Sequence, residues 1–301
     1  MNDTERAKRA EEFYASFLKY TETLFIDLTA RNELDFNSVV EKIRMVTEFV
    51  KKDRRYLMHA KQVVESDANE NYHISHSVRS SIIALIIGIY LKLPKHRLIE
   101  VGVAALVRDI SILKLPPDIY LNGGTTEQER RLMAVHPIHA YKIIKGFNFP
   151  LSICEAVLQH HEREDGSGYP QKLTGDRIGV YGKIIAVACS YEAFSTKHVD
   201  EAKCGHMGMM TLLKNEGNQF DETVVRALVY SLSIYPVGTY VLLSDGRQGQ
   251  VVDADPENPR YPIVHVHGEP LPGEIDNTLK TSPKGVSIVR TLTRKEVVVS
   301  T

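Results

Sequence analysis

The chain has 301 residues, of which 43% are hydrophobic and 25% are charged, as in ordinary folded globular proteins. Its 37 Lys and Arg and 38 Asp and Glu residues give a formal net charge of −1, so bulk charge does not draw it to a nucleic acid polymer or an anionic membrane. Three cysteines without paired spacing exclude a disulfide framework, and the charged N-terminus lacks the apolar run of a secretory signal. We therefore expect a cytoplasmic protein.

The first sixty residues contain no proline and no glycine, and their apolar residues recur at helical spacing in two runs. These runs are Phe13, Phe17, Tyr20 and Leu24, then Val39, Val40, Ile43, Val46, Phe49 and Val50. The pattern predicts two helices that pack together, and we assign residues 1–66 to an N-terminal helical module. It is either a regulatory or homodimerising unit or a decoration of the main domain. The basic pairs Lys51-Lys52 and Arg54-Arg55 are predicted to form a solvated helix face.

Residues 67–234 keep the helical pattern and are predicted to form the main domain. Their most apolar stretch, Ile82 to Leu91, is about half the ~20 residues that a membrane-spanning helix needs. We therefore predict that it is a buried core helix and that the chain has no membrane span.

Residues 235–301 have a different character, because short β-rich runs alternate with turn clusters after Pro236. The predicted strands are Thr239 to Leu243, Gln248 to Val252 and Ile263 to His267. The predicted fold class is therefore mostly α, a helical bundle with an N-terminal helical module and a small C-terminal β appendage.

Residues 160–170 read HHEREDGSGYP and are the most informative part of the chain. Neutral imidazoles such as those of His160 and His161 are suitable ligands for Fe, Mn or Zn. Gly166 and Gly168 allow backbone conformations and close approaches that a Cβ would block, so the loop can bring amide groups against a phosphate. The segment predicts a site that joins metal and phosphate chemistry.

This segment resembles the HHE-x-x-DG-x-GYP signature of the HD-GYP family, a branch of the HD metal-dependent phosphohydrolases. Further elements match in order between residues 72 and 230: His76, the Arg108-Asp109 pair, His136, the run IIAVAC at 184–189, and Phe220-Asp221. The resemblance implies an HD-type helical bundle in which ligands from separate helices hold two or three metals. In the family these metals, assisted by a lysine, open cyclic-di-GMP.

The resemblance assigns Asp109, His136, His160 and His161 to the second metal, and all four are present. It implies an Fe, Mn or Zn ion, and because the first metal's ligands are largely replaced, we predict at most one ion per chain. It also implies that Gly166, Gly168 and Tyr169 contact the nucleotide.

The first metal's ligands are largely replaced. Arg108 stands in place of a histidine and offers no lone pair to a metal, and Cys189 stands in place of an aspartate. The remaining ligands are His76 and the shared Asp109, with Cys189 either a soft replacement or an inert core residue. We expect the Arg108 guanidinium to occupy the first metal's space and to replace part of its charge.

Three other positions also depart from the family. The lysine position is Ile112, so no catalytic residue is assigned, and Tyr72 stands where three-metal members carry a glutamate. The segment His198 to Glu201 carries Asp200 and Glu201 where the family has basic residues. Two carboxylates there would repel an anionic dinucleotide.

Three functions remain open at this point. The chain is a degenerate HD-GYP protein that serves cyclic-di-GMP signalling as a nucleotide-responsive or scaffold protein with weak or no catalysis, the hypothesis that we favour. Alternatively, it is an active phosphodiesterase that uses the one retained metal site. In the third hypothesis it is purely a protein-interaction module, with signalling partners that the sequence does not identify.

Overall fold

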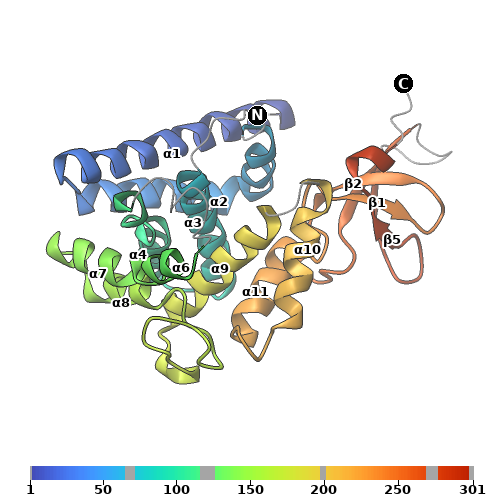
Figure 1. Cartoon of the computed structure of the whole chain (residues 1–301). Coiled ribbons are helices and arrows are strands. Elements are labelled where there is room, and N and C mark those ends of the chain that lie inside the picture. The colour runs from blue at the N-terminus through green and yellow to red at the C-terminus, as the bar shows by residue number, and fades with distance from the viewer. Residues whose placement is uncertain (1, 65–71, 116–125, 197–200, 269–276, 298–301) are drawn as a thin grey trace.

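The computed structural model describes residues 2–64, 72–115, 126–196, 201–268 and 277–297, with only the backbone described at 61–64, 196 and 201–204. These residues form a largely helical body with a small antiparallel sheet at its C-terminal end (Figure 1). The predicted fold class is confirmed. None of the helices in the described ranges is both long and apolar enough to span a bilayer.

Helices α1 (Asp3–Arg31) and α2 (Phe36–Val64) run side by side along one flank of the molecule (Figure 1). Helix α1 begins with a capping box between Asn2 and Glu5, which satisfies backbone N–H groups of its first turn. The predicted apolar stripes face each other, and the rings of Phe13 and Phe49 stack with centroids 4.3 Å apart. The two predicted helices are confirmed, whereas a homodimer through them stays a prediction.

The helical body is built around α3 (Tyr72–Tyr90), which contacts α1, α2, α4, α9 and α11. The remaining helices are α4 (Lys95–Val107), α6 (Glu127–Ala134), α7 (His136–Gly146), α8 (Leu151–Gln159), α9 (Val180–Thr196), α10 (Glu201–Lys214) and α11 (Glu222–Leu232), with short 3-10 turns η1 (Ile112–Lys114), η2 (Gly175–Arg177) and η3 (Arg294–Glu296). Nearly every side chain of α3 is buried, from His73 to Gly88. The prediction of a buried core helix is therefore confirmed.

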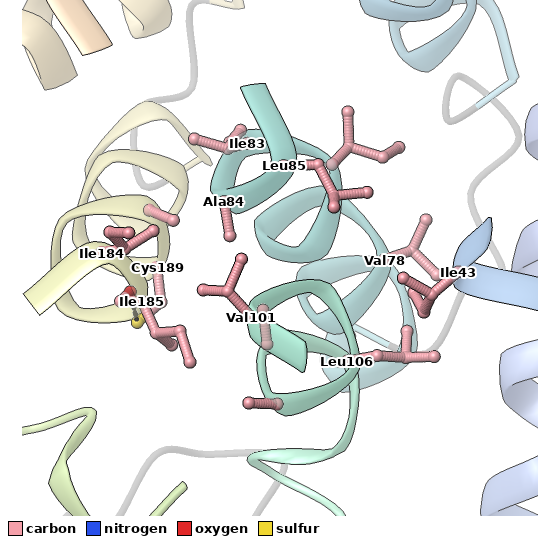
Figure 2. Packing of buried hydrophobic residues seen from close by; sticks show 14 of the residues in the cluster. Ile43, Val78, Ile83, Ala84, Leu85, Val101, Leu106, Ile184, Ile185 and Cys189 are labelled. Carbon is pink, nitrogen blue, oxygen red and sulfur yellow. Dashed lines mark hydrogen bonds between the residues drawn. The ribbon is translucent and has the colours of Figure 1, made fainter. Parts of the chain in front are cut away.

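One hydrophobic core joins the N-terminal helices to the body. Ile43 of α2, Leu85 of α3 and Val101 of α4 are fully or nearly fully buried in the same cluster (Figure 2). The buried residues of the sheet, Val241, Leu243, Val251, Val264 and Val266, form a second cluster. The division of the chain at residues 66 and 234 stays a prediction.

The sheet has the strand order β4-β3-β2-β1-β5, with every neighbouring pair antiparallel. Its strands are β1 (Tyr240–Leu243), β2 (Gln248–Asp253), β3 (Ile263–Val266), β4 (Thr278–Lys280) and β5 (Ile288–Thr291). The three predicted strands are confirmed to within a residue or two at each end. The sequence reading missed β4 and β5.

The basic segment of α2 is only partly solvated. Lys51 and Lys52 are exposed, but Arg54 and Arg55 are half-buried, so the predicted solvated face is wrong for the two arginines. Between the pairs, Asp53 leaves helical geometry with φ −134° and ψ 33°, and its side chain is buried. The kink turns this part of α2 into the wall of a cavity.

Candidate metal centre

Four potential ligands meet where helices end. Asp109 follows α4, His136 begins α7, and His160 and His161 directly follow α8. One ligand atom from each lies within 4.8 Å of the others, and all but the half-buried His161 are buried. The structure thus brings together the residues that the family resemblance assigned to the second metal.

The backbone fixes the proton positions of two of these histidines. Nδ1 of His136 lies 2.6 Å from the carbonyl oxygen of Met133, and Nδ1 of His160 lies 2.6 Å from that of Val157. A carbonyl oxygen only accepts hydrogen bonds, so each Nδ1 carries the proton. Each neutral ring therefore presents the lone pair of Nε2, which is the form that a metal binds.

These lone pairs converge on one point. The Nε2 atoms of His136 and His160 are 3.2 Å apart, and Oδ1 of Asp109 lies 3.2 Å from the first and 3.5 Å from the second. Burial lowers the pKa of His160 to about 4, more than the neighbouring Asp109 raises it, so the ring is neutral at pH 7. Three buried acceptors facing one another suit a cation. The nitrogen and oxygen donors fit Fe, Mn or Zn.

Asp109 is an ionised carboxylate despite its burial. Burial would raise its pKa, but the adjacent Arg108 guanidinium holds that pKa well below its usual range. Nη2 of Arg108 lies 2.9 Å from Oδ2 of Asp109, and Nη1 donates to the carbonyl oxygen of Ala105 at 2.6 Å. The two oxygens of Asp109 are therefore divided, with Oδ1 facing the imidazoles and Oδ2 facing the fully buried Arg108.

The side of the site beyond Arg108 is closed by a second set of charges. Glu192 of α9 is fully buried, contacts Nδ1 of His76, and lies 2.5 Å from Nε of Arg79. Burial, followed by the charge of Arg108, lowers the pKa of His76 well below its usual range. Tyr72 stacks its ring on that of His76 with centroids 5.3 Å apart. In the described residues, His76 lies outside the four-ligand cluster.

The sequence did not predict Glu192 or Arg79 as part of the site. Glu192 follows Cys189 by three residues, which places both on one face of α9, and this spacing is the signal that could have found it.

Cys189 is a hydrogen-bonded core residue in this structure. Its thiol donates to the carbonyl oxygen of Ile185, with the sulfur 2.8 Å away, and it lies among apolar neighbours (Figure 2). Burial raises the pKa of the Cys189 thiol, so the thiolate that a metal needs is disfavoured. Ile112, at the family's lysine position, is also buried and apolar.

The loop after the paired histidines needs both of its glycines. Gly166 has φ +76°, in the left-handed region that glycine tolerates best. A Cβ on Gly168 would lie 2.5 Å from backbone atoms of Glu162 and Arg163. This close approach brings the Tyr169 ring onto that of His161, with centroids 4.7 Å apart. Burial raises the pKa of Tyr169, which stays a phenol beside the four-ligand cluster.

Glu162 fastens the far end of this loop. The residue is 1% exposed, and its carboxylate accepts hydrogen bonds from the backbone N–H groups of Gln171 at 2.7 Å and Leu173 at 2.9 Å. Glu162 belongs to the signature segment, but its position in the sequence alone does not predict this function. The predicted acidic segment from His198 to Glu201 lies outside the residues whose side chains are described.

Comparison with known proteins identifies the family of the chain. The family model described as "HD domain" matches residues 60–224, more than half of the chain. The chain therefore belongs to the HD domain family, within its HD-GYP branch.

Particular relatives carry a more specific description. The chain is 32% identical over 197 residues to "Cyclic di-GMP phosphodiesterase PdeB" of Borreliella burgdorferi, covering 65% of this chain and 52% of the relative. It is 28% identical over 206 residues to "Cyclic di-GMP phosphodiesterase PA4108" of Pseudomonas aeruginosa, covering 68% and 50%. The chain thus spans about half the length of these curated relatives.

A solved structure supports the fold alone. Bd1817, described as an HDG"Y"P protein from Bdellovibrio bacteriovorus, superposes with a TM-score of 0.58 at 16% identity. The match covers 76% of this chain and 72% of Bd1817.

Proposed function

We propose that this chain is a degenerate HD-GYP domain that holds a single metal ion and serves cyclic-di-GMP signalling in the cytoplasm as a nucleotide-responsive or scaffold protein. Its turnover of nucleotide is weak or absent. The observation that carries this proposal is the environment of Asp109. Its carboxylate lies in one cluster with three imidazoles that can hold an ion, and its Oδ2 is paired with the Arg108 guanidinium, which cannot bind a metal.

The retained half of the site supports the single ion. Asp109, His136, His160 and His161 would hold Fe, Mn or Zn, because their donor atoms converge and two of the rings are locked with Nε2 unprotonated. A bound ion supplies Lewis acidity toward a phosphate oxygen and activates water. The Tyr169 loop beside it supports contact with a nucleotide.

The altered half supports weak catalysis. Arg108 occupies the Oδ2 side of Asp109, and the Cys189 thiol donates its proton in a hydrogen bond to the carbonyl oxygen of Ile185. Ile112 offers no charge where a lysine would assist. With one ion, the clamping of phosphate and the activation of water are not shared between two metals, so the rate should fall strongly.

Hydrolysis of cyclic-di-GMP is the experiment that tests the proposal. The purified chain is supplied anaerobically with Fe(II) or Mn(II), and the linear dinucleotide and GMP are followed by chromatography. We expect little or no product from folded, metal-loaded protein, and binding of cyclic-di-GMP by calorimetry would then separate a sensor from a scaffold. Because two relatives are described as 3'3'-cGAMP-specific phosphodiesterases, that dinucleotide is assayed in parallel.

The second candidate is an active one-metal phosphodiesterase, and the complete four-ligand cluster favours it. Metal-dependent product that disappears in His160→Ala would establish this enzyme and overturn our first proposal. Protein that binds neither metal nor nucleotide would instead support a pure interaction module.

A further inference from the structure

A basic cavity lies at the junction of three parts of the molecule, away from the metal cluster. We call it the junction cavity; its walls include Arg6 of α1, Lys52, Arg54 and Arg55 beside the kink of α2, Ile86 of α3, and Asp253 at the end of β2. Its volume is about 370 Å³, near the lower end of the range of ligand pockets.

Some of the charges in its wall are already paired. Nη2 of Arg6 lies 2.8 Å from the buried carboxylate of Asp53. Arg55 has Asp3 at 3.3 Å and Asp253 at 3.9 Å. These pairs account for both carboxylates that line the cavity.

Lys51 also lines the cavity and is paired with Glu48 at 3.3 Å, so Lys52 and Arg54 are the charges that remain. Neither has an ion pair or a hydrogen bond with any residue in the described ranges. Arg54 is half-buried, and burial lowers its pKa, an effect that the more distant Asp253 only partly opposes. An arginine stays protonated in proteins, so Arg54 is a desolvated cation without a bonded counterion.

Part of the remaining wall is apolar. Ile89 of α3 is partly exposed there, whereas Ile86 and Val50 are each only 2% exposed, so a bare inorganic ion would leave the exposed part of Ile89 without contact. A small hollow shares the walls formed by Arg54 and Asp253 and is also lined by Ser231. The Ser231 hydroxyl is buried, and no hydrogen-bond partner for it lies in the part of the chain that the structure describes.

We propose that the junction cavity binds a small phosphorylated molecule with an apolar portion, about the size of a nucleoside monophosphate. Lys52 and Arg54 contact its phosphate, and the partly exposed Ile89 of α3 contacts part of the rest. Guanidinium groups suit phosphate because their N–H groups match its oxygen geometry. This site is separate from the metal centre and from its nucleotide.

The test is calorimetric titration of the full chain with 5'-AMP and with inorganic pyrophosphate. We expect one AMP per chain, with pyrophosphate binding more weakly because it lacks contact with the apolar wall. Arg54→Gln and Lys52→Gln should each weaken AMP binding by about tenfold, the usual effect of losing one charged hydrogen bond. The control Arg44→Gln, at an exposed position on α2 paired with Glu41, should leave the affinity unchanged.

Further variants make the outcome decisive. AMP binding should survive in His160→Ala, and its loss there would assign it to the metal centre and overturn the proposal. Unchanged affinity in both Arg54→Gln and Lys52→Gln, or no saturable binding of either probe at millimolar concentration, would also overturn it. If Arg54→Gln fails to fold, Lys52→Gln decides, since the Lys52 side chain is exposed. Sedimentation with phosphatidylglycerol vesicles that depends on Arg54 would indicate a lipid headgroup instead and contradict the soluble ligand.

Discussion

The two carboxylate oxygens of Asp109 differ in how their buried negative charge is compensated. On the Oδ1 side, the Nε2 atoms of His136 and His160 offer lone pairs, and no Lys or Arg among the described residues forms an ion pair with Oδ1. On the Oδ2 side, Arg108 supplies a cation from within the chain, next to the buried Arg79–Glu192 ion pair, which His76 contacts. A buried carboxylate needs a positive partner, which can be an ion from solution or a side chain. The chain uses a side chain on one side and leaves the other open to an ion.

The largest effect is expected from removing the internal cation. Arg108→Leu leaves Oδ2 of Asp109 buried without its partner, so the free energy of unfolding should fall by about 3–5 kcal/mol in urea denaturation. Arg226→Leu removes an exposed partner of Glu222 on α11 and should cost less than about 1 kcal/mol. Equal losses in the two variants would mean that the Arg108 pair is unimportant for stability.

The next largest effect concerns the open side. His160→Ala removes one of the converging Nε2 donors. Loss of a residue that only hydrogen-bonds to a metal ligand typically lowers metal affinity 10–100-fold, so the affinity for Fe(II) or Mn(II) should fall on the order of 100-fold. Metal per chain would be measured by mass spectrometry on protein purified without chelator. The matched control is His139→Ala, an exposed histidine one turn along α7 from His136. Undiminished metal in His160→Ala would refute the cluster as the site.

Acid should destabilise the metal-free protein. Burial lowers the pKa of His160 from 6.5 to about 4, so between these values the unfolded chain binds more protons than the folded one. The free energy of unfolding then decreases as the pH falls, by about 1–2 kcal/mol between pH 6.5 and 5. Urea midpoints at several pH values measure this slope. It should be shallower in His160→Gln but not flat, because burial also lowers the pKa of His161 and His76.

The smallest expected effect is a change in stoichiometry. Arg108→His combined with Cys189→Asp restores two ligand types on the closed side, and metal content should rise from one ion per chain toward two. Cys189→Asp alone should not raise it, because Arg108 would still occupy the Oδ2 side. No rise in the double variant would show that other residues also close the first site, with the His76–Glu192 pair the first to examine.

Patterns that repeat along the chain were readable from sequence. The apolar stripes of Val39 and Ile43, the run after Ile82, and the alternation from Thr239 onward each reflect one regular element burying one face. Strands β4 and β5 were missed because they have three and four residues, with at most partly buried side chains. Strand β5 exists through pairing with β1, which no local pattern reveals.

The residues of the site also fall into those that the sequence locates and those that only the tertiary structure brings together. His160, His161, Gly166 and Gly168 lie in one short string, so sequence located them. The Arg79–Glu192 pair joins residues from α3 and α9. The sequence of either helix alone does not predict a buried charge, because the partner that stabilises it lies on the other helix. The half-burial of Arg54 likewise depends on the kink at Asp53 and on the approach of β2, both of which are tertiary features.

The Glu162 carboxylate has a consequence for ligand binding. By holding the amides of Gln171 and Leu173, it ties the exit of the Tyr169 loop to the residue next to His161. The loop therefore loses its conformational entropy when the chain folds, before any ligand binds. A ligand that stacks against Tyr169 meets a preorganised surface, and little of its affinity is spent on ordering the loop.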